Sequence, residues 1–156
     1  MKYTLKQRFL SWLDSYDIYD ENDNVAFSVE GKFALGHSFE VYDSSHNLIG
    51  EIKQKLLSLT PTFEIYKLGE CVGTIKKEFT FFTPKFDIDY RNWRMKGDIW
   101  EWDYEIYAED SLVATCQKEL FNFTDTYVFD VFNEEDIDDV LMVVVAIDAA
   151  KCSESN

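Results

Sequence analysis

One short pattern of apolar and polar positions recurs along the chain: an aromatic residue, an acid, Ile or Val, and usually Tyr. Its copies are Tyr16–Tyr19, Phe39–Tyr42, Phe63–Tyr66, Phe86–Asp89 and Tyr104–Tyr107, with a looser copy at Tyr127–Asp130. Alternation of this kind predicts a strand with the aromatic and the Ile or Val on one face. Recurrence at steps of about 23 residues, with one shorter step, indicates a repeated supersecondary unit.

A turn and a second apolar run follow the copies. The turns contain Asp, Asn, Ser or Gly, as in residues 20–24, 43–47 and 68–70, and the second runs are Val25–Val29, Leu48–Ile52, Val72–Ile75 and Leu112–Cys116. A strand, a turn and a strand form a β-hairpin. We therefore expect five hairpins which, with strands near residues 2–7 and 126–131, give about twelve strands.

The C-terminal segment breaks this pattern. Asn133 can cap a helix, and the acids at 134–136 suit the positive end of a helix dipole. Residues 140–147 are apolar on every side, so they predict a helix over 134–150 that must be buried. A buried strand is the competing local reading, because valine is common in this run. The run is far shorter than the roughly 20 residues of a membrane span, and acids flank it.

A helix inside an all-β domain requires a barrel wide enough to hold it. About eleven strands can enclose a central helix, whereas eight leave room only for side chains. Small residues (Gly50, Gly73 and Ala114) fall two positions before inward Ile52, Ile75 and Cys116, although Phe27 breaks this rule. We predict a mainly β fold: one domain over residues 1–150, a closed antiparallel β-barrel of about twelve strands around a buried C-terminal helix, with a tail at 151–156.

The charge is strongly negative but uneven. A net charge of -15 argues against nucleic acid as a partner and disfavours contact with anionic membranes. Residues 53–96 hold nine of the 15 basic residues and are net positive, whereas 97–156 are strongly acidic. Any site for an anionic ligand is therefore expected on the face carrying Lys53, Lys55, Lys76, Lys85, Arg91 and Arg94. The competing explanation is cross-strand ion pairing with Glu40 and Glu64.

Patterns typical of enzymes are weak. Gly36–Glu40 resembles a serine hydrolase elbow but lacks the second Gly, and His37 and Ser38 face opposite sides of a strand. His46 falls in a hairpin turn. Asp148 follows the apolar run, where a structural hydrogen bond or a nearby Lys is favoured over catalysis. We expect no catalytic residue and no cofactor.

Patterns typical of metal sites are equally weak. Residues 20–24 imitate the start of a calcium loop, but Val25 and Gly31 stand where that loop needs Gly and Glu. The acids at 134–139 could hold a hard cation, but compensation of the helix dipole explains the first three. Two isolated histidines make a zinc site improbable, so we expect no metal.

The start of the chain lacks the apolar core of a secretion signal, and the three cysteines are far apart (Cys71, Cys116 and Cys152). We therefore expect a reduced, cytoplasmic setting and no transmembrane segment.

Several segments resemble the LURP-one-related family: Val29–Phe33, Phe79–Phe86, Gly97–Trp100 and Ala146–Ala149. That family belongs to the tubby C-terminal-like superfamily, alongside the phospholipid scramblases. The resemblance covers about residues 3–150 and implies a twelve-stranded barrel around a hydrophobic C-terminal helix. Plant members are linked to defence, and tubby domains bind phosphoinositide head groups through basic residues, a motif that does not match here residue by residue.

Function is less determined than fold. We favour a non-enzymatic binding or scaffold module whose partner is an unknown protein or a small anionic ligand. The alternative is a protein that binds lipid or phosphoinositide head groups at a membrane surface, and a cryptic hydrolase ranks last.

Overall fold

The chain folds into twelve strands and one long helix. The computed structural model describes residues 1–6, 15–78, 80–82, 85–119 and 126–153. The strands are β1 (Lys2–Lys6), β2 (Tyr16–Tyr19), β3 (Val25–Ala34), β4 (Gly36–Asp43), β5 (Leu48–Gln54), β6 (Thr62–Lys67), β7 (Glu70–Glu78), β8 (Lys85–Asp89), β9 (Trp93–Asp98), β10 (Asp103–Ala108), β11 (Ser111–Glu119) and β12 (Thr126–Val131). A short 3₁₀ turn, η1 (Glu134–Asp136), leads into α1 (Ile137–Cys152).

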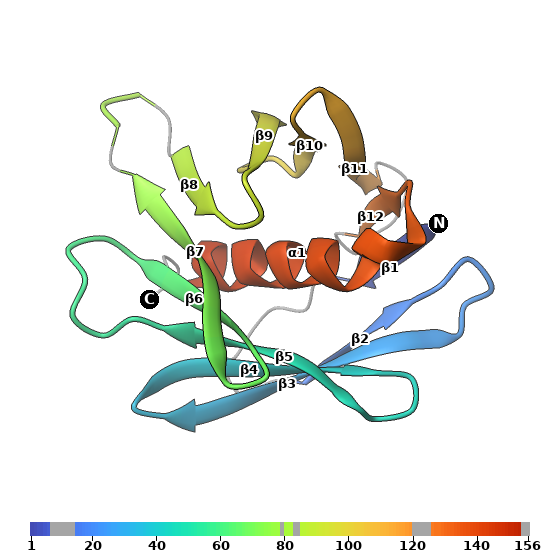
Figure 1. The fold of residues 1–156 in the computed structure, drawn as a ribbon, viewed down its shortest axis with the longest axis horizontal. Helices are drawn as coiled ribbons and strands as arrows, with labels where there is room; N and C mark the ends of the chain where they lie inside the picture. The colour runs from blue at the N-terminus through green and yellow to red at the C-terminus, as the bar shows by residue number, and fades with distance from the viewer. Residues whose placement is uncertain (7–14, 79, 83–84, 120–125, 154–156) are drawn as a thin grey trace.

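All strands belong to one antiparallel sheet that curls into a nearly closed barrel around α1 (Figure 1). Neighbours in the sheet are neighbours in the sequence, except that β1 pairs with β12 and so joins the two halves. The two outermost strands of the sheet order are β8 and β9, and no ladder joins them within the described residues. This opening is called the seam below.

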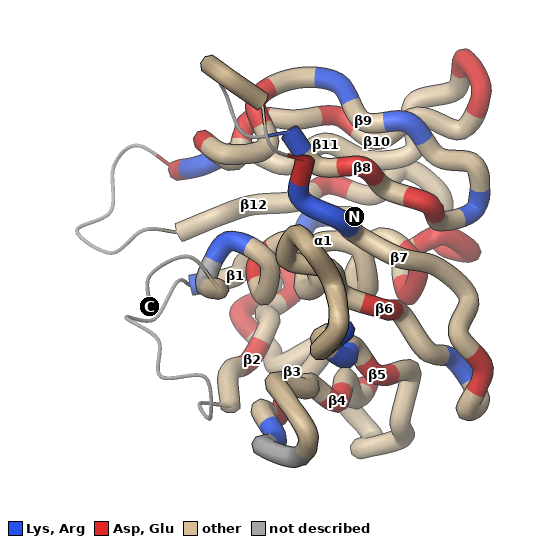
Figure 2. Tube along the Cα trace, turned by 90° about the vertical axis from the view of Figure 1, so that its left-hand side faces the viewer, with Lys and Arg blue, Asp and Glu red and all other residues tan. Residues whose placement is uncertain are grey.

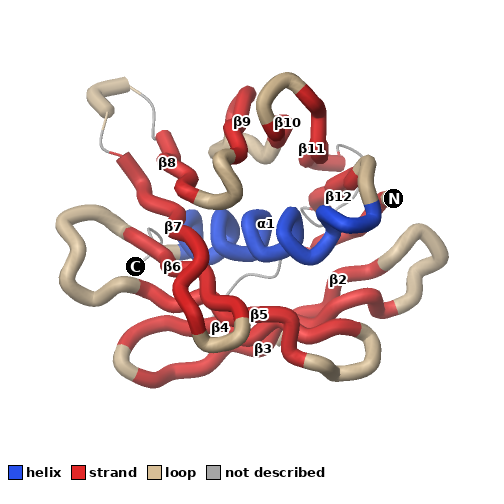
Figure 3. Tube along the Cα trace, viewed as in Figure 1, coloured by secondary structure: helices blue, strands red, loops and turns tan. Residues whose placement is uncertain are grey.

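The helix lies inside the barrel, as its sequence predicts (Figure 3). Every residue from Val140 to Ile147 is buried. Gly50 makes room for it, because a Cβ there would lie 2.7 Å from the side chain of Met142. The same role predicted for Gly73 is wrong, since that glycine admits the ring and backbone around Tyr90 instead.

The predicted hairpins form, with one exception. Ladders join β2 to β3, β4 to β5, β6 to β7 and β10 to β11. The fourth unit, β8 and β9, has its turn but no ladder. The helix also starts later than expected, because 134–136 form the 3₁₀ turn, and Asn133 makes no side-chain capping bond.

Because consecutive strands pair antiparallel, their connections alternate between the two ends of the barrel. The β2–β3, β4–β5, β6–β7, β8–β9 and β10–β11 turns and the start of α1 form what we call the hairpin end. The β3–β4, β5–β6, β7–β8 and β9–β10 connections and the last turn of α1 form the loop end. In Figures 1 and 3 the first three of these connections project on the left, and the β2–β3 and β4–β5 turns on the right.

Candidate functional site

Large apolar side chains project into solvent from the loop end. Leu35 in the β3–β4 connection is 88% exposed, and Leu57 and Leu59 in the β5–β6 connection are 96% and 101% exposed. Phe81 and Phe82 in the β7–β8 connection are 101% and 98% exposed. These five side chains are called the apolar tips below. Among the other large apolar side chains of the described residues, only that of Leu68 in the β6–β7 turn is exposed to this degree, at 102%.

Four of the six basic residues predicted to bind anions lie beside the apolar tips. Lys53 is the last residue but one of β5, and Lys55 is the first residue of the β5–β6 connection. Lys76 lies near the end of β7, and Lys85 is the first residue of β8. The other two, Arg91 and Arg94, lie at or next to the β8–β9 turn, at the hairpin end. The predicted set is therefore split between the two ends of the barrel.

Some of these bases already have acidic partners. Lys53 pairs with Glu51 at 3.1 Å, although the expected partner Glu64 lies opposite it in the ladder. Glu40 pairs with Lys32 at 3.5 Å. Figure 2 shows basic and acidic segments interspersed over β4 to β9. Anion binding at the four residues near the apolar tips stays a prediction.

Of the two arginines, Arg91 serves local structure at the hairpin end. Arg91 binds the carboxylates of Asp136 and Asp139, each at 2.7 Å. Asp139 also accepts hydrogen bonds from Lys67 and Tyr90. Burial alone would raise the pKa of Asp139, but these bonds and the neighbouring positive charges outweigh it and lower that pKa. The cluster ties the start of α1 to two hairpin turns.

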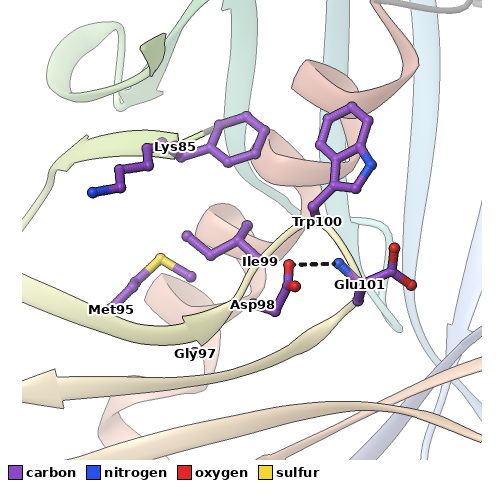
Figure 4. A pocket seen from close by; sticks show the side chains of 8 residues that line it. Lys85, Met95, Gly97, Asp98, Ile99, Trp100 and Glu101 are labelled. Atoms are coloured by element: carbon purple, nitrogen blue, oxygen red, sulfur yellow. Dashed lines mark hydrogen bonds between the residues drawn. The ribbon is translucent and has the colours of Figure 1, made fainter. Parts of the chain in front are cut away.

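A cavity of about 550 Å³ opens at the seam, close to the loop end (Figure 4). Its walls come from the start of β8, from the end of β9 and from the β9–β10 connection. They are Lys85, Phe86, Met95, Gly97, Asp98, Ile99, Trp100 and Glu101. The backbone N–H of Glu101 donates to the Asp98 carboxylate at 3.1 Å, which holds the β9–β10 connection against β9. Its lining is mixed, with apolar side chains such as Phe86, Met95 and Trp100 beside the charged Lys85, Asp98 and Glu101.

Two further ammonium groups lie beside the cavity wall. The Nζ atoms of Lys77 and Lys151 lie 5.2 and 5.5 Å from the ring centre of Trp100. Lys151 also donates hydrogen bonds to the carbonyls of Ile99 and Trp100. Burial lowers the pKa of Lys77, and it lowers the pKa of Lys151 to about 8 against the opposing charge of Asp148.

Asp148 lies fully inside the barrel near the end of α1. Burial raises its pKa to about 6, while the charge of Lys151 and a long 3.5 Å hydrogen bond from the Tyr16 hydroxyl oppose that rise. The expectation of a nearby Lys and a hydrogen bond is thus confirmed. The group is enclosed by the core and electrostatically coupled to Lys151, and this favours a structural role over catalysis.

The weaker motifs take structural roles. Asp20 accepts backbone N–H bonds from Asn22 and Asn24 at 2.8 and 2.9 Å, so the imitation calcium loop is a turn. His46 has left-handed backbone angles in the β4–β5 turn and stacks on Tyr42. Within the described residues, no group of three or more His, Cys, Asp or Glu side chains is placed to hold a metal ion. No described helix has the length and apolar character needed to cross a bilayer.

Neither the seam nor the apolar tips could be read from strand periodicity. A signal for the tips is present, however. Residues 56–59 and 80–82 hold leucines and phenylalanines between strands, without alternation and without a single acid. Apolar residues in a connection contribute little to a core, and this distinguishes them from the strand positions on either side.

Comparisons with known proteins agree on the family and the fold. The family model described as LURP-one-related matches residues 1–148. "Uncharacterized protein YxjI" from Bacillus subtilis (strain 168) is 33% identical over 145 residues, which span 92% of this chain and 90% of that protein. The X-ray structure of the Arabidopsis thaliana protein AT5G01750 has a TM-score of 0.59 at 16% identity, covering 94% of this chain and 90% of the other. At that identity the likeness concerns the fold alone.

Proposed function

Since the chain belongs to the LURP-one-related family, whose fold it shares, we propose that it is a non-enzymatic binding module that docks on lipid surfaces through the apolar tips. The observation that carries this proposal is their exposure: five large apolar side chains stand almost wholly in water, from three connections at one end. Clustered exposed apolar groups mark interaction sites, because leaving them in water is unfavourable.

The form of this surface favours a lipid bilayer over a protein partner. The tips are separate projections on three connections, and these can each enter the interfacial layer of a bilayer. Lysines border them, and basic residues next to an apolar surface attract anionic lipid head groups. Lys32, Lys53, Lys55, Lys76 and Lys85 lie on the strands and connections that carry the tips.

The net charge of -15 does not oppose this orientation, because the acids are unevenly placed. The hairpin end holds acidic turns such as 20–23 and 109–110 and the acidic start of α1, whereas residues 55–61 and 80–82 contain no acid. Repulsion between exposed charges and a membrane falls off within about 8 Å at physiological salt. The acidic end would face away from the membrane.

The test is flotation with vesicles of phosphatidylcholine alone and of phosphatidylcholine with phosphatidylserine. We expect the protein to float with both, and more with the anionic vesicles at low salt. Phe81→Ser with Phe82→Ser should weaken binding about tenfold or more, because burying each ring stabilises the bound state by about 1.5–3 kcal/mol. Leu68→Ser is the matched control, since Leu68 is equally exposed but lies at the hairpin end.

The lysines are tested separately. Lys53→Gln, Lys55→Gln and Lys76→Gln together should reduce binding to phosphatidylserine vesicles at low salt and leave binding to neutral vesicles unchanged. A parent protein that ignores both kinds of vesicle would refute lipid docking and leave a protein-binding scaffold as the remaining candidate. Equal binding by the parent and the double Phe variant would also refute it.

A further inference from the structure

The β8–β9 turn has the geometry of a tight hairpin. Arg91 and Asn92 have φ angles of 51° and 56°, and the Trp93 N–H donates to the Tyr90 carbonyl at 2.9 Å. Two central residues with positive φ form the turn type that most favours a two-residue hairpin. Tyr90 and Trp93 are both buried, and their rings meet edge to face. The turn therefore sets Tyr90 opposite Trp93.

Extending this register along both strands pairs charges of opposite sign. Asp89 falls opposite Arg94, Asp87 opposite Lys96, and Lys85 opposite Asp98. These six side chains are all exposed, on the outer face. The inner face would pair Ile88 with Met95 and Phe86 with Gly97. A slip of one residue would set each outward side chain against an inward one, and a slip of two is excluded by the two-residue turn that sets Tyr90 opposite Trp93.

In the structure the strands separate beyond the turn, and these charges make other contacts. Arg94 lies 3.4 Å from the carboxylate of Asp110, which is fully exposed. Lys96 lies 4.5 Å from the ring centre of Tyr107. No ion pair within the described residues involves Asp87 or Asp89. Exposed contacts of this kind contribute little and exchange easily.

We propose that the seam is the entrance to a binding site for a small amphiphile with an anionic group, and that β8 and β9 also adopt a closed form in which they pair in this register. The cavity exists because the strands are apart. Its walls include Phe86, Met95 and Gly97, which the paired register would bring together. Ligand binding and strand pairing therefore exclude each other, and a ligand would stabilise the open form that the structure shows.

The cavity walls indicate the class of ligand. Phe86, Met95, Ile99 and Trp100 offer an apolar surface to the body of the molecule. Lys85 lines the cavity, and the ammonium groups of Lys77 and Lys151 lie 5.2 and 5.5 Å from the ring centre of Trp100, so these positive charges favour an anionic group on the ligand. Asp98 and Glu101 also line the cavity and would repel an anion placed against them, so we expect the anionic group on the side of Lys85 and Trp100.

Disulfide trapping tests the register. Asp87→Cys with Lys96→Cys would place two Cα atoms about 4.5 Å apart in the paired form, within the range that a disulfide requires. Asp87→Cys with Met95→Cys is the matched control, because it belongs to the slipped register. Both pairs are made with Cys71→Ser and Cys152→Ser. Cys116 can stay, since burial raises its pKa to about 12 and leaves it unreactive.

We expect the 87–96 disulfide to form under mild oxidation, mapped by mass spectrometry, and to form at least tenfold faster than the 87–95 disulfide. Adding 8-anilinonaphthalene-1-sulfonate, an aromatic body with a sulfonate, should slow the 87–96 reaction severalfold. The locked protein should bind the dye more weakly than its reduced form. If the 87–96 disulfide does not form in a folded protein, or if both disulfides form at equal rates, the proposed pairing register of β8 and β9 is wrong.

An unchanged rate of disulfide trapping at saturating dye would contradict the proposal that the seam is the entrance to the binding site. Equal dye binding by the locked and the reduced protein would contradict it as well. The probe is soluble and no vesicle is present, so the outcome does not depend on lipid docking. Phe81→Ser with Phe82→Ser should leave both the trapping rate and its response to the dye unchanged. A loss of the response in that variant would place the dye at the apolar tips and overturn the cavity site.

Discussion

The two ends of the barrel are built on different principles. At the hairpin end, Asp20 and Asp43 accept backbone N–H bonds within their turns, and Asp23, His46 and Glu109 take left-handed angles that close tight hairpins. At the loop end, by contrast, the most exposed side chains are leucines and phenylalanines that contact no core. The turn hydrogen bonds and backbone angles at the hairpin end serve folding, whereas the exposed apolar side chains at the loop end do not. Side chains that add nothing to the fold and are costly in water indicate an interaction surface.

The helix shows the same contrast in a partly buried acid, Asp139, and a fully buried one, Asp148. Asp139, in the first turn of α1, is stabilised in its charged form by Lys67, Tyr90 and Arg91. Asp148, near the last turn, is held against its charged form by burial. A carboxylate suits the N-terminal end of a helix and is disfavoured at the C-terminal end. At the hairpin end the charge of Asp139 is thus stabilised by its neighbours, whereas at the loop end burial disfavours the charge of Asp148.

The largest effect is expected in the helix that connects the two ends. Val144 is 1% exposed, so Val144→Asp would place an unpaired charge in the core. We expect a loss of about 5 kcal/mol or more, comparable to the whole stability of a domain. Circular dichroism should show an unfolded or severely destabilised protein. A folded variant with an unchanged melting temperature would contradict the buried helix.

The next effect tests the anchoring of the hairpin end. Asp139→Ala removes the acceptor shared by Lys67, Tyr90 and Arg91 and leaves their polar groups half-buried without it. We expect urea unfolding to show a loss of about 2–3 kcal/mol. Glu135→Ala is the control, because Glu135 is exposed and should change stability by less than about 0.5 kcal/mol. Similar values for both variants would mean that the cluster does not anchor the helix.

A smaller effect of opposite sign is expected at the loop end. The raised pKa of Asp148, about 6, favours the folded state at low pH and loses that contribution as the pH rises towards 6. The lowered pKa of Lys151, about 8, restores a contribution only as the pH rises above 8. Together the two groups reduce stability most between pH 6 and 8.

Asp148→Leu with Lys151→Met should therefore raise the free energy of unfolding near neutral pH by about 1–2 kcal/mol, because apolar residues of similar volume replace two groups whose charged forms are disfavoured by burial. The gain should shrink at about pH 5 and again above about pH 9. Lys151→Met alone should destabilise the protein, since it leaves Asp148 without its cation. A gain that does not vary with pH would exclude the pair as its source.

The smallest effect is expected at the apolar tips. Phe82→Ser and Leu57→Ser should change the free energy of unfolding by no more than about 0.5 kcal/mol, because both side chains already stand in water. Thermal unfolding checks this. A loss above 1 kcal/mol would mean that the tips pack against the fold, and would remove the contrast between the two ends.

Sequence reasoning predicted the elements well and the surfaces poorly. The alternation in copies such as Phe63–Tyr66 states which face is buried, and the run Val140–Ile147 leaves no polar side, so barrel and helix follow from local pattern. The division of the six basic residues between the two ends of the barrel does not follow from local pattern, because it depends on which end of its strand each residue occupies. Lys85 begins β8 at the loop end, whereas Arg91, six positions later, lies in the β8–β9 turn at the hairpin end. The seam also escapes local pattern, because β8 and β9 each alternate like paired strands.

The most direct test of lipid docking is an environment-sensitive fluorophore at each end of the barrel. Phe82→Cys and Leu68→Cys, each made with Cys71→Ser and Cys152→Ser, would carry nitrobenzoxadiazole at equally exposed positions. With phosphatidylcholine–phosphatidylserine vesicles, the probe at position 82 should brighten and shift to the blue, while the probe at position 68 should not change. No change at position 82, or equal changes at both positions, would contradict docking through the loop end.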